Sequence, residues 1–461
     1  MKAIIILFAT AMVVLFTGIS GKRTWLLPLS VVGLLGALAS LVSDAFLPIL
    51  SYGGMVRFDG FGLAYSGLVI GAATLIFLLS GDFYRGLKHT LADHYGLLLF
   101  SLTGALCMFS FEHMVMLFLG IEILSIPLYV MAGSRMDDLK SSEAALKYFL
   151  MGSFATGILL FGITLVYGAT GEFEITKIQQ ALDVKKVYSM PLFNTGLLLI
   201  IAGLSFKVSA APFHFWSPDV YEGSPSLVTA YMATIVKAAG FGAFYKLFVL
   251  GFGPETPYWS MTIAVLAALT MTVGNITAVM QNNFKRMMAY SSISHAGYLM
   301  LGLLSGSAGS QGIFLYLMAY AVATIAAFSV FMFVNREDDL EGGKFSAFAG
   351  LNKIDPLAAF VMALSMVSLA GIPITAGFFG KFFLFAGAFG GFPWLVGIAV
   401  INSAISIAYY FRVIVEMYMN DAKGELSFTT TPKVYRLVMV LAAIVLLGLA
   451  FIPDQVLALV P

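Results

Sequence analysis

The sequence predicts an all-α, polytopic membrane protein with about 14 transmembrane helices. The chain has 461 residues, of which 60% are hydrophobic and only 11% are charged, whereas about 25% of an average soluble domain is charged. Its apolar residues come in runs of about 20, the length that a helix needs to cross the hydrocarbon core of a bilayer. Charged residues, glycines and prolines separate these runs. The pattern excludes an ordinary soluble domain.

The apolar runs follow one another along the whole chain. They are Ala3 to Ile19, Trp25 to Val42, Phe61 to Leu79, Leu91 to Phe111, Met114 to Met131, Ala144 to Tyr167, Leu192 to His214, Leu227 to Leu250, Tyr258 to Val279, Met287 to Leu304, Gly312 to Val334, Leu357 to Phe389, Trp394 to Met419 and Val434 to Ile452. The first run lacks a basic leading region and a small-residue cleavage site, so we expect a retained helix rather than a signal peptide.

Lysines and arginines are distributed unequally between the two sides of the predicted membrane. One side holds Lys22, Arg23, Arg85, Lys88, Arg135, Lys140, Lys285, Arg286, Arg336, Lys344, Lys353, Arg412, Lys423, Lys433 and Arg436, and the other holds Lys2, Arg57, Lys177, Lys185 and Lys186. Because cytoplasmic loops carry the excess of positive charge, the first side is expected to be cytoplasmic and both termini to lie outside. The net charge of +1 itself indicates no partner.

Two runs contain breaks, and the breaks are arranged in opposite order. In the seventh run Lys207 precedes Pro212, whereas in the twelfth run Pro373 precedes Lys381. Proline removes a backbone donor and clashes with the preceding turn, so both helices are expected to be discontinuous, with their freed carbonyls facing protein or water. The twelfth run is also too long for one straight helix across about 30 Å of hydrocarbon.

The reversed order favours two inverted repeats. If runs four to eight and nine to thirteen are copies of one five-helix unit, the odd number of spans gives them opposite orientations, as in many secondary transporters. We therefore expect four segments along the chain. They are 1–90 with three helices, 91–250 with the first repeat, 257–420 with the second repeat, and 430–461 with the last helix.

Four ionisable residues lie deep inside apolar runs: Glu122, Lys207, Lys237 and Lys381. An ionised group at that depth costs several kcal/mol and usually marks an ion or proton path. For Glu122 the structural alternative is a neutral, hydrogen-bonded carboxyl. A pair between Glu122 and Lys207 would keep both charged, and opening the pair would favour release of the lysine's proton.

Other polar residues in the runs are less telling. Lys147 follows Glu143 by four residues, so a surface ion pair explains it as well as a proton path does. For Lys246 we expect a side chain that reaches to the interface. His214 and His295 are candidate proton relays because a neutral imidazole shuttles protons easily, and their different depths argue against a haem. Further hydroxyl and amide candidates, which could equally serve helix packing, are Ser291, Ser292, Ser294, Thr324, Asn402 and Ser403.

Redox centres and nucleotide sites are not expected on this chain. Cys107 is the only cysteine, so the chain cannot supply four thiolates to an iron–sulfur cluster. No glycine-rich dinucleotide fingerprint follows a strand pattern, and no Walker motif occurs. We expect no cofactor and no metal here, so electrons must be handled elsewhere.

Three stretches resemble a known family. Phe206 to Pro225, with its sequence FKVSAAPFHFWSPDVYEGSP, is similar to the seventh-helix motif of subunit N of the proton-pumping NADH:quinone oxidoreductase, respiratory complex I. Asn283 to Tyr298 and Gly371 to Lys381 look like two further segments of that antiporter-like subunit. The resemblance extends over nearly the whole chain, and the first motif is highly specific.

The resemblance implies an antiporter-like fold and a role for each ionisable residue. Glu122 and Lys207 would be the coupling pair, Lys237 the connecting residue and Lys381 the exit-side lysine. Lys147 and His214 match positions regarded as part of the proton route, which strengthens their candidacy beyond what the residues alone indicate.

The function expected from the resemblance is proton translocation, driven by NADH oxidation and quinone reduction in sister subunits. The whole complex would use FMN, iron–sulfur clusters and quinone, and this chain would carry no redox centre. Its partners would be other complex I membrane subunits and the lipid of a bacterial inner membrane, with no nucleic acid. Two alternatives stay open: a subunit of a multisubunit cation/proton antiporter, and a structural spacer in a membrane complex.

Overall fold

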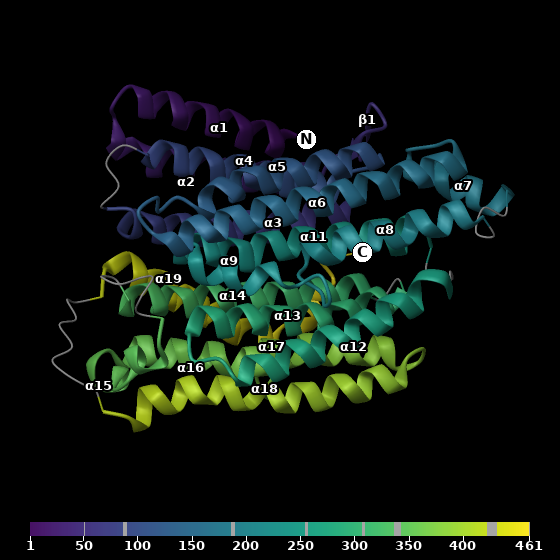
Figure 1. Ribbon diagram of the computed structural model, residues 1–461. Helices are drawn as coiled ribbons and strands as arrows, with labels where there is room; N and C mark the ends of the chain where they lie inside the picture. Colours follow the sequence, from purple (N-terminus) through teal and green to yellow (C-terminus); the bar gives the residue numbers. More distant parts are fainter. Residues whose placement is uncertain are drawn as a thin grey trace.

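The apolar runs fold as long helices that lie nearly parallel to one another (Figure 1). The structure is a computed structural model that describes residues 1–49, 51–85, 90–185, 190–253, 257–306, 309–335, 343–421 and 431–460. In the view of Figure 1 the N-terminal half forms the upper part of the bundle and the green C-terminal half the lower part. β1 and α7 lie toward one end of the bundle, and α15 lies at the other.

The first half of the chain crosses the bundle eight times, and the seventh crossing is broken into α8 and α9. Its elements are α1 (Lys2–Ile19), η1 (Arg23–Trp25), α2 (Leu26–Ala45), β1 (Ser51–Tyr52), β2 (Val56–Arg57), α3 (Gly60–Phe83), α4 (Leu91–Ser110), α5 (Met114–Ala132), α6 (Leu139–Thr170), α7 (Ile175–Lys185), α8 (Pro191–Lys207), α9 (Trp216–Gly223), α10 (Ser226–Tyr231), η3 (Met232–Val236), α11 (Lys237–Tyr245) and η4 (Lys246–Gly251). The strands β1 and β2 form one short antiparallel hairpin between α2 and α3.

The second half continues with six crossings. Its elements are α12 (Pro257–Val279), α13 (Phe284–Leu303), α14 (Gly309–Val334), η6 (Phe345–Phe348), α15 (Leu351–Ile354), α16 (Pro356–Ala370), α17 (Ala376–Phe389), α18 (Pro393–Met419), α19 (Lys433–Phe451) and α20 (Pro453–Leu457). In the described part of the chain, 11 helices are long and apolar enough to cross a membrane. The remaining crossings are α13 and the broken pairs α8/α9 and α16/α17, so the predicted fold class is confirmed.

Both predicted breaks are present. The helix α8 ends at Lys207, the chain passes through Pro212 without helix, and α9 begins at Trp216. The helix α16 ends at Ala370, and the next residue, Gly371, is left-handed with φ 78°, a conformation that glycine adopts without strain and that commonly ends a helix. After the bend at Pro373, α17 starts at Ala376.

The two repeats pack their helices in the same order. In the first, α4 lies against α5, α5 against α6, and α6 against the broken helix α8. In the second, α12 lies against α13, α13 against α14, and α14 against the broken pair α16 and α17. This correspondence, together with the reversed order of lysine and break, is the arrangement of inverted repeats.

The eighth crossing lies at the centre of the bundle and is irregular. Within its 26-residue span, Ser226–Gly251, a stretch of 18 residues is completely buried. Two π-helical turns, η3 and η4, interrupt it on either side of α11, a feature often found at functional sites that the apolar pattern did not predict.

The connection between α6 and α8 contains the short helix α7, whose residues Ile178 and Leu182 are buried. Residues 336–342, between α14 and η6, lie outside the described part of the chain, as do Lys88, Lys186 and Lys423.

Candidate functional site

Lys207, the last residue of α8, is buried with 6% of its surface exposed. Its ammonium donates to the hydroxyl of Ser125 on α5 at 2.5 Å. Glu122 lies one turn before Ser125 on the same helix and is half-buried. In the part of the chain that the structure describes, no ion pair within 4.0 Å joins Glu122 to Lys207. The expected direct pair is therefore wrong for this conformation, in which Ser125 takes the ammonium instead.

Lys237, the first residue of α11, is 3% exposed and lies between the two repeats. Its ammonium donates to the backbone carbonyl of Ser292 on α13 and lies 5.9 Å from the centre of the Tyr320 ring. The hydroxyl of Ser292 is 3.4 Å from that of Tyr221 on α9. The predicted connecting lysine thus contacts the second repeat directly.

Lys381 on α17 is also 3% exposed. Its ammonium donates to the carbonyl of Ala370 at 2.8 Å and to the hydroxyl of Ser403 at 3.0 Å, and it lies 4.7 Å from the centre of the Tyr298 ring. Ala370 is the last residue of α16, whose final carbonyls have no partner within the helix. The break therefore supplies the oxygen that holds this lysine.

His295 on α13 joins the polar groups between Lys237 and Lys381. Its Nδ1 is 2.5 Å from the hydroxyl of Tyr316, and its Nε2 is 2.8 Å from the hydroxyl of Tyr410. The hydroxyl of Tyr410 is also hydrogen-bonded to the hydroxyl of Ser291, at 2.5 Å. Because a neutral imidazole has one donor and one acceptor nitrogen, one tyrosine donates to the ring and the other accepts from it.

A second polar group surrounds Asn275 on α12. Its amide nitrogen donates to the hydroxyl of Tyr298 at 3.1 Å and to the side-chain oxygen of Asn402 at 3.3 Å. Its own oxygen accepts from Tyr409 at 2.9 Å. Asn402 was expected from the sequence, but Asn275 was missed, although an asparagine inside an apolar helix is itself a signal.

Tyrosines are the larger omission from the sequence interpretation. Tyr316 and Tyr410 bond His295, and Tyr298 lies beside Lys381. Tyrosines are common apolar packing residues, and only the fold reveals which hydroxyls meet a titratable group. A Cβ added at Gly380 would lie 2.6 Å from Cδ2 of Tyr316, so this tyrosine packs directly beside the turn that carries Lys381.

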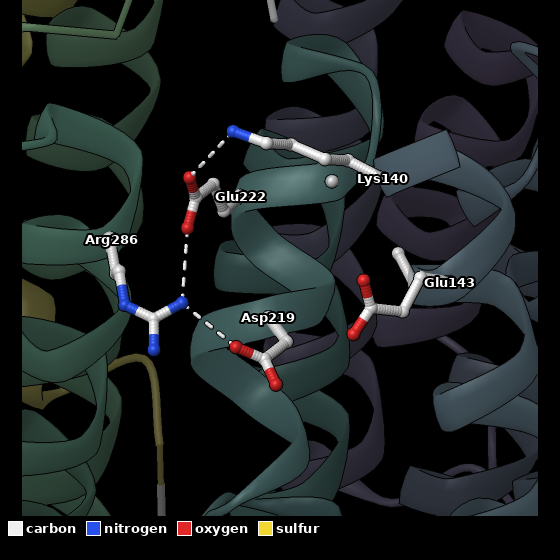
Figure 2. A pocket seen from close by; sticks show the side chains of 7 residues that line it. Lys140, Glu143, Asp219, Glu222 and Arg286 are labelled. Atoms are coloured by element: carbon white, nitrogen blue, oxygen red, sulfur yellow. Dashed lines mark hydrogen bonds and ion pairs between the residues drawn. The ribbon is translucent and has the colours of Figure 1, made fainter. Parts of the chain in front are cut away.

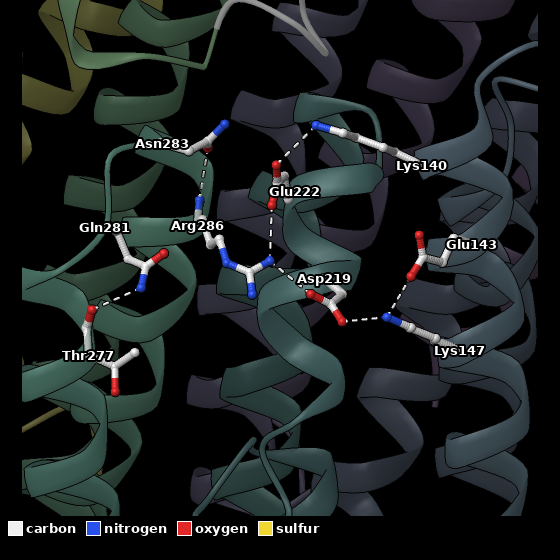
Figure 3. Close-up of polar contacts among 9 residues, drawn as sticks. All are labelled: Lys140, Glu143, Lys147, Asp219, Glu222, Thr277, Gln281, Asn283 and Arg286. Carbon is white, nitrogen blue, oxygen red and sulfur yellow. Dashed lines mark hydrogen bonds and ion pairs between the residues drawn. The ribbon is translucent and has the colours of Figure 1, made fainter.

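Lys147 lies away from this buried chain, in a cluster of charges at one end of the bundle (Figure 3). It is 38% exposed and contacts Glu143 on its own helix and Asp219 on α9, each at 2.6 Å. The surface pair with Glu143 is thus present, and Asp219 is an additional partner that the sequence did not indicate. Figure 2 shows the same cluster around a cavity of about 160 Å³.

His214 lies in the break between α8 and α9 and is buried at 7% exposure. It lines a cavity of about 630 Å³ together with Asp219, Arg286 and Tyr290. His214 therefore belongs to the charged end of the bundle, whereas His295 belongs to the buried chain. The structure brings together Lys237, His295 and Lys381, but it does not place Lys147 or His214 among them.

Lys246 is covered by protein, whereas a side chain that reaches along an exposed surface was expected. Only 4% of it is exposed, and its ammonium donates to the carbonyl of Phe109 at 3.1 Å. It also lies 3.6 Å from the carboxylate of Glu112, in the connection between α4 and α5. Lys246 therefore lies near the end of α4, but it is buried and paired there.

Known proteins resemble this chain over its full length. The family model described as NADH:quinone oxidoreductase/Mrp antiporter, TM matches residues 112–406. NADH-quinone oxidoreductase subunit N of Cytophaga hutchinsonii is 42% identical over 94% of this chain and 93% of its own. Subunit N of Flavobacterium psychrophilum is 40% identical over 100% of both chains.

Solved structures agree with the sequence comparisons. A chain of respiratory complex I from Thermus thermophilus with bound aureothin has a TM-score of 0.84 and 32% identity, covering 99% of this chain and 98% of that one. A chain of the Mrp complex from Dietzia sp. DQ12-45-1b has a TM-score of 0.83 at 21% identity and is covered over 51% of its length, which shows the shared fold alone. The chain therefore belongs to the subunit N family of NADH-quinone oxidoreductase, the antiporter-like membrane subunits of respiratory complex I.

Proposed function

We propose that this chain moves protons across the membrane through a buried chain of Glu122, Lys207, Lys237 and Lys381, driven by redox chemistry in other subunits. The observation that carries the proposal is the state of the three lysines. Each is at most 6% exposed, and among the described residues none has a carboxylate within 4.0 Å. Buried ammonium groups without ion-pair partners are costly in a membrane and are typical of proton relays.

The first step of this proposal is a change of partner at Lys207. Glu122 and Ser125 are three residues apart and so lie on the same face of α5. A small movement of the lysine or of α5 would exchange the hydroxyl of Ser125 for the carboxylate of Glu122. Since a carboxylate favours the charged lysine more than a hydroxyl does, this exchange would control when Lys207 holds or releases its proton.

The second step runs from Lys237 to Lys381 through His295. Lys237 donates to the backbone carbonyl of Ser292, which cannot itself pass on a proton. The relay of side chains begins at the neighbouring Ser291, whose hydroxyl bonds Tyr410, and Tyr410 bonds one nitrogen of His295. A bridging water would carry the proton from Lys237 to Ser291. A proton that reaches one ring nitrogen releases the proton of the other, and Tyr316 on that second nitrogen packs beside the helix of Lys381.

Protons would be taken up at the charged end of the bundle. Lys147 is partly exposed there and bonds two carboxylates, and His214 borders a cavity of about 630 Å³ that also contacts Asp219. In this scheme 91–250 takes up the proton and 257–420 passes it on, with 1–90 and 430–461 as flanking helices. By the distribution of lysine and arginine, this end is cytoplasmic and both termini are periplasmic.

The energy for transport would come from partners. Relatives of this chain are named as subunits of NADH-quinone oxidoreductase, so NADH oxidation and quinone reduction, with FMN, iron–sulfur clusters and quinone, would take place in other subunits. This chain would contact antiporter-like and small membrane subunits in a bacterial inner membrane. It contributes to the enzyme as its proton-translocating part.

The test is proton pumping by the purified complex in liposomes, driven by NADH and quinone. Lys207→Ala should lower proton uptake and quinone reduction at least about tenfold while the complex still assembles, since no other ammonium among the described residues contacts Ser125. Lys353→Ala is the matched control because Lys353 is 73% exposed and, within the described part of the chain, pairs with Asp421 alone. Normal pumping by an assembled Lys207→Ala complex would refute the proposal. Sodium–proton exchange without NADH would instead indicate a cation/proton antiporter.

A further inference from the structure

Six charged residues from three helices meet around the short helix α9 (Figures 2 and 3). Asp219 and Glu222 belong to α9 itself, and Arg286 belongs to α13 of the second repeat. The same Nη1 atom of Arg286 donates to Asp219 at 2.8 Å and to Glu222 at 3.0 Å. The other three residues, all on α6, are Lys140, Glu143 and Lys147.

Each carboxylate of α9 is held from both sides. Lys147 donates to the second oxygen of Asp219 at 2.6 Å, and Lys140 donates to the second oxygen of Glu222 at 3.2 Å. Figure 3 shows the two lysines reaching from one side and Arg286 from the other. The helix α9 is therefore clamped between α6 of the first repeat and α13 of the second.

The same short helix contacts both halves of the proposed proton path. Trp216, its first residue, donates from its ring nitrogen to the carbonyl of Phe206 at 3.1 Å, next to Lys207. Tyr221 lies 3.4 Å from the hydroxyl of Ser292, whose carbonyl accepts from Lys237. A shift of α9 would thus change the surroundings of both lysines.

The position of α9 depends strongly on side-chain contacts. It has only eight residues, and an isolated helix of that length is not stable. The break before it and the Ser224–Pro225 bend after it disconnect it from the longer helices α8 and α10. Stacking of Trp216 on Tyr148 of α6 holds its first turn. Its last turn is held against α13 by the charged cluster and by Lys285, whose ammonium donates to the carbonyl of Ser224 just after α9.

Asp219 and Arg286 also line two cavities, one of about 160 Å³ and one of about 630 Å³ that His214 lines as well. Breaking the pair would change the lining of both cavities.

We propose that Asp219 and Arg286 are positioning residues, whose ion pair fixes α9 against the second repeat and so keeps Lys207 and Lys237 in the relative placement that proton transfer requires. The proposal rests on the proton-translocating function proposed above. Neither residue receives the transported proton in this account; both act through the position of α9.

The test uses the assembled complex and two measurements on Arg286→Gln. The first is hydrogen–deuterium exchange of the backbone amides of residues 216–223, which reports how often α9 opens. Loss of two charge-assisted bonds should speed this exchange about tenfold or more. The second is the number of protons moved per electron, which should fall by about half or more as transfer between the lysines fails, while NADH oxidation with a soluble acceptor stays unchanged.

Two further variants separate positioning from general damage. Arg412→Gln removes the same charge near the connection between α12 and α13. Among the described residues Arg412 donates to the carbonyl of Gln281 and the side-chain oxygen of Asn282 and lies over the ring of Phe345, with no contact to α9, so both readouts should remain normal. Arg286→Lys keeps a cation that reaches one carboxylate and should restore much of the exchange protection and of the proton yield.

The outcomes distinguish this inference from the proposed function. Unchanged exchange in α9 together with an unchanged proton yield in Arg286→Gln would overturn the inference and leave the lysine path intact. Normal pumping by Lys207→Ala would overturn the path, whatever α9 does. If Arg286→Gln fails to assemble, the isosteric Asp219→Asn decides, because Glu222 still holds Arg286 in that variant.

Discussion

Ser125 provides the sharpest test of how Lys207 is controlled. The structure shows the ammonium of Lys207 bonded to Ser125 at 2.5 Å, with Glu122 one turn away and outside ion-pair distance. If the lysine alternates between these two partners, removal of either partner stops the alternation. Ser125→Ala leaves only the carboxylate, and Glu122→Gln leaves only uncharged partners.

The size of the effect follows from the bond that is lost. A hydrogen bond to a charged group contributes about 1.5–3 kcal/mol, and about 1.4 kcal/mol corresponds to a factor of ten. Ser125→Ala should therefore shift the lysine toward Glu122 by roughly 10- to 150-fold, and pumping should fall by at least about tenfold. Proton uptake by the complex in liposomes, divided by the amount of assembled complex, measures this change.

The double variant makes the test decisive. Residues that act as one unit lose about as much singly as together, so Ser125→Ala, Glu122→Gln and the double variant should all pump at about the same low rate. Two independent contributions would instead multiply in the double variant, and that result would refute the alternation. Ser101→Ala serves as the control, since this buried serine donates to the carbonyl of Leu124 and to no lysine.

Two further predictions concern the path beyond Lys207. Lys237→Arg replaces the ammonium with a guanidinium, which stays charged in proteins. We therefore expect pumping to fall at least about tenfold in a complex that still assembles. Pumping at the wild-type rate would mean that Lys237 need not release a proton. Tyr410→Phe removes one of the two hydrogen bonds of His295 and should slow pumping about tenfold. The control is Tyr65→Phe, which loses a bond to the carbonyl of Ser310 and should leave pumping per complex unchanged. An equal effect of both tyrosine variants would argue against a relay through His295.

The sequence predicted those parts of the site that depend on local chemistry. A proline disfavours the continuation of a helix, so the interruptions near Pro212 and Pro373 could be located without the fold, although Pro127 lies inside the unbroken helix α5. A lysine in an apolar run is costly in any packing arrangement, so Lys207, Lys237 and Lys381 could be selected as well. All three are buried in the structure.

Contacts between distant segments could not be predicted in the same way. Whether Lys207 meets Glu122 or Ser125 depends on a rotation of α5 by part of a turn, which the apolar pattern does not determine. Lys246 was expected to reach along an exposed surface because it lies near the end of its run, but neighbouring helices cover it, and it contacts Phe109 and Glu112. From the sequence, Arg286 was counted only as one of the charges on the predicted cytoplasmic side. Its contacts with α9 could not be foreseen, because Glu222 lies 64 residues earlier in the chain.

The acceptors of the three lysines indicate where control is exerted. Lys381 is bonded to the carbonyl of Ala370, a backbone oxygen that the helix break leaves free and that no rotamer change can move. Lys237 is bonded to the carbonyl of Ser292 in the middle of the continuous helix α13, where each carbonyl already has a partner within the helix. Among the described contacts, Lys207 is the one lysine of the three that has no backbone acceptor; a side-chain hydroxyl holds it, and a second side chain on the same face of α5 can replace that hydroxyl. A signal from neighbouring subunits can therefore change the partner of Lys207 with a small movement, whereas the other two lysines change only if a helix moves. Control of the path is therefore expected at Lys207. The helix α9 contacts Phe206, the residue before Lys207, and the hydroxyl of Ser292, beside Lys237. A change of partner at Lys207 can reach the second repeat through this helix.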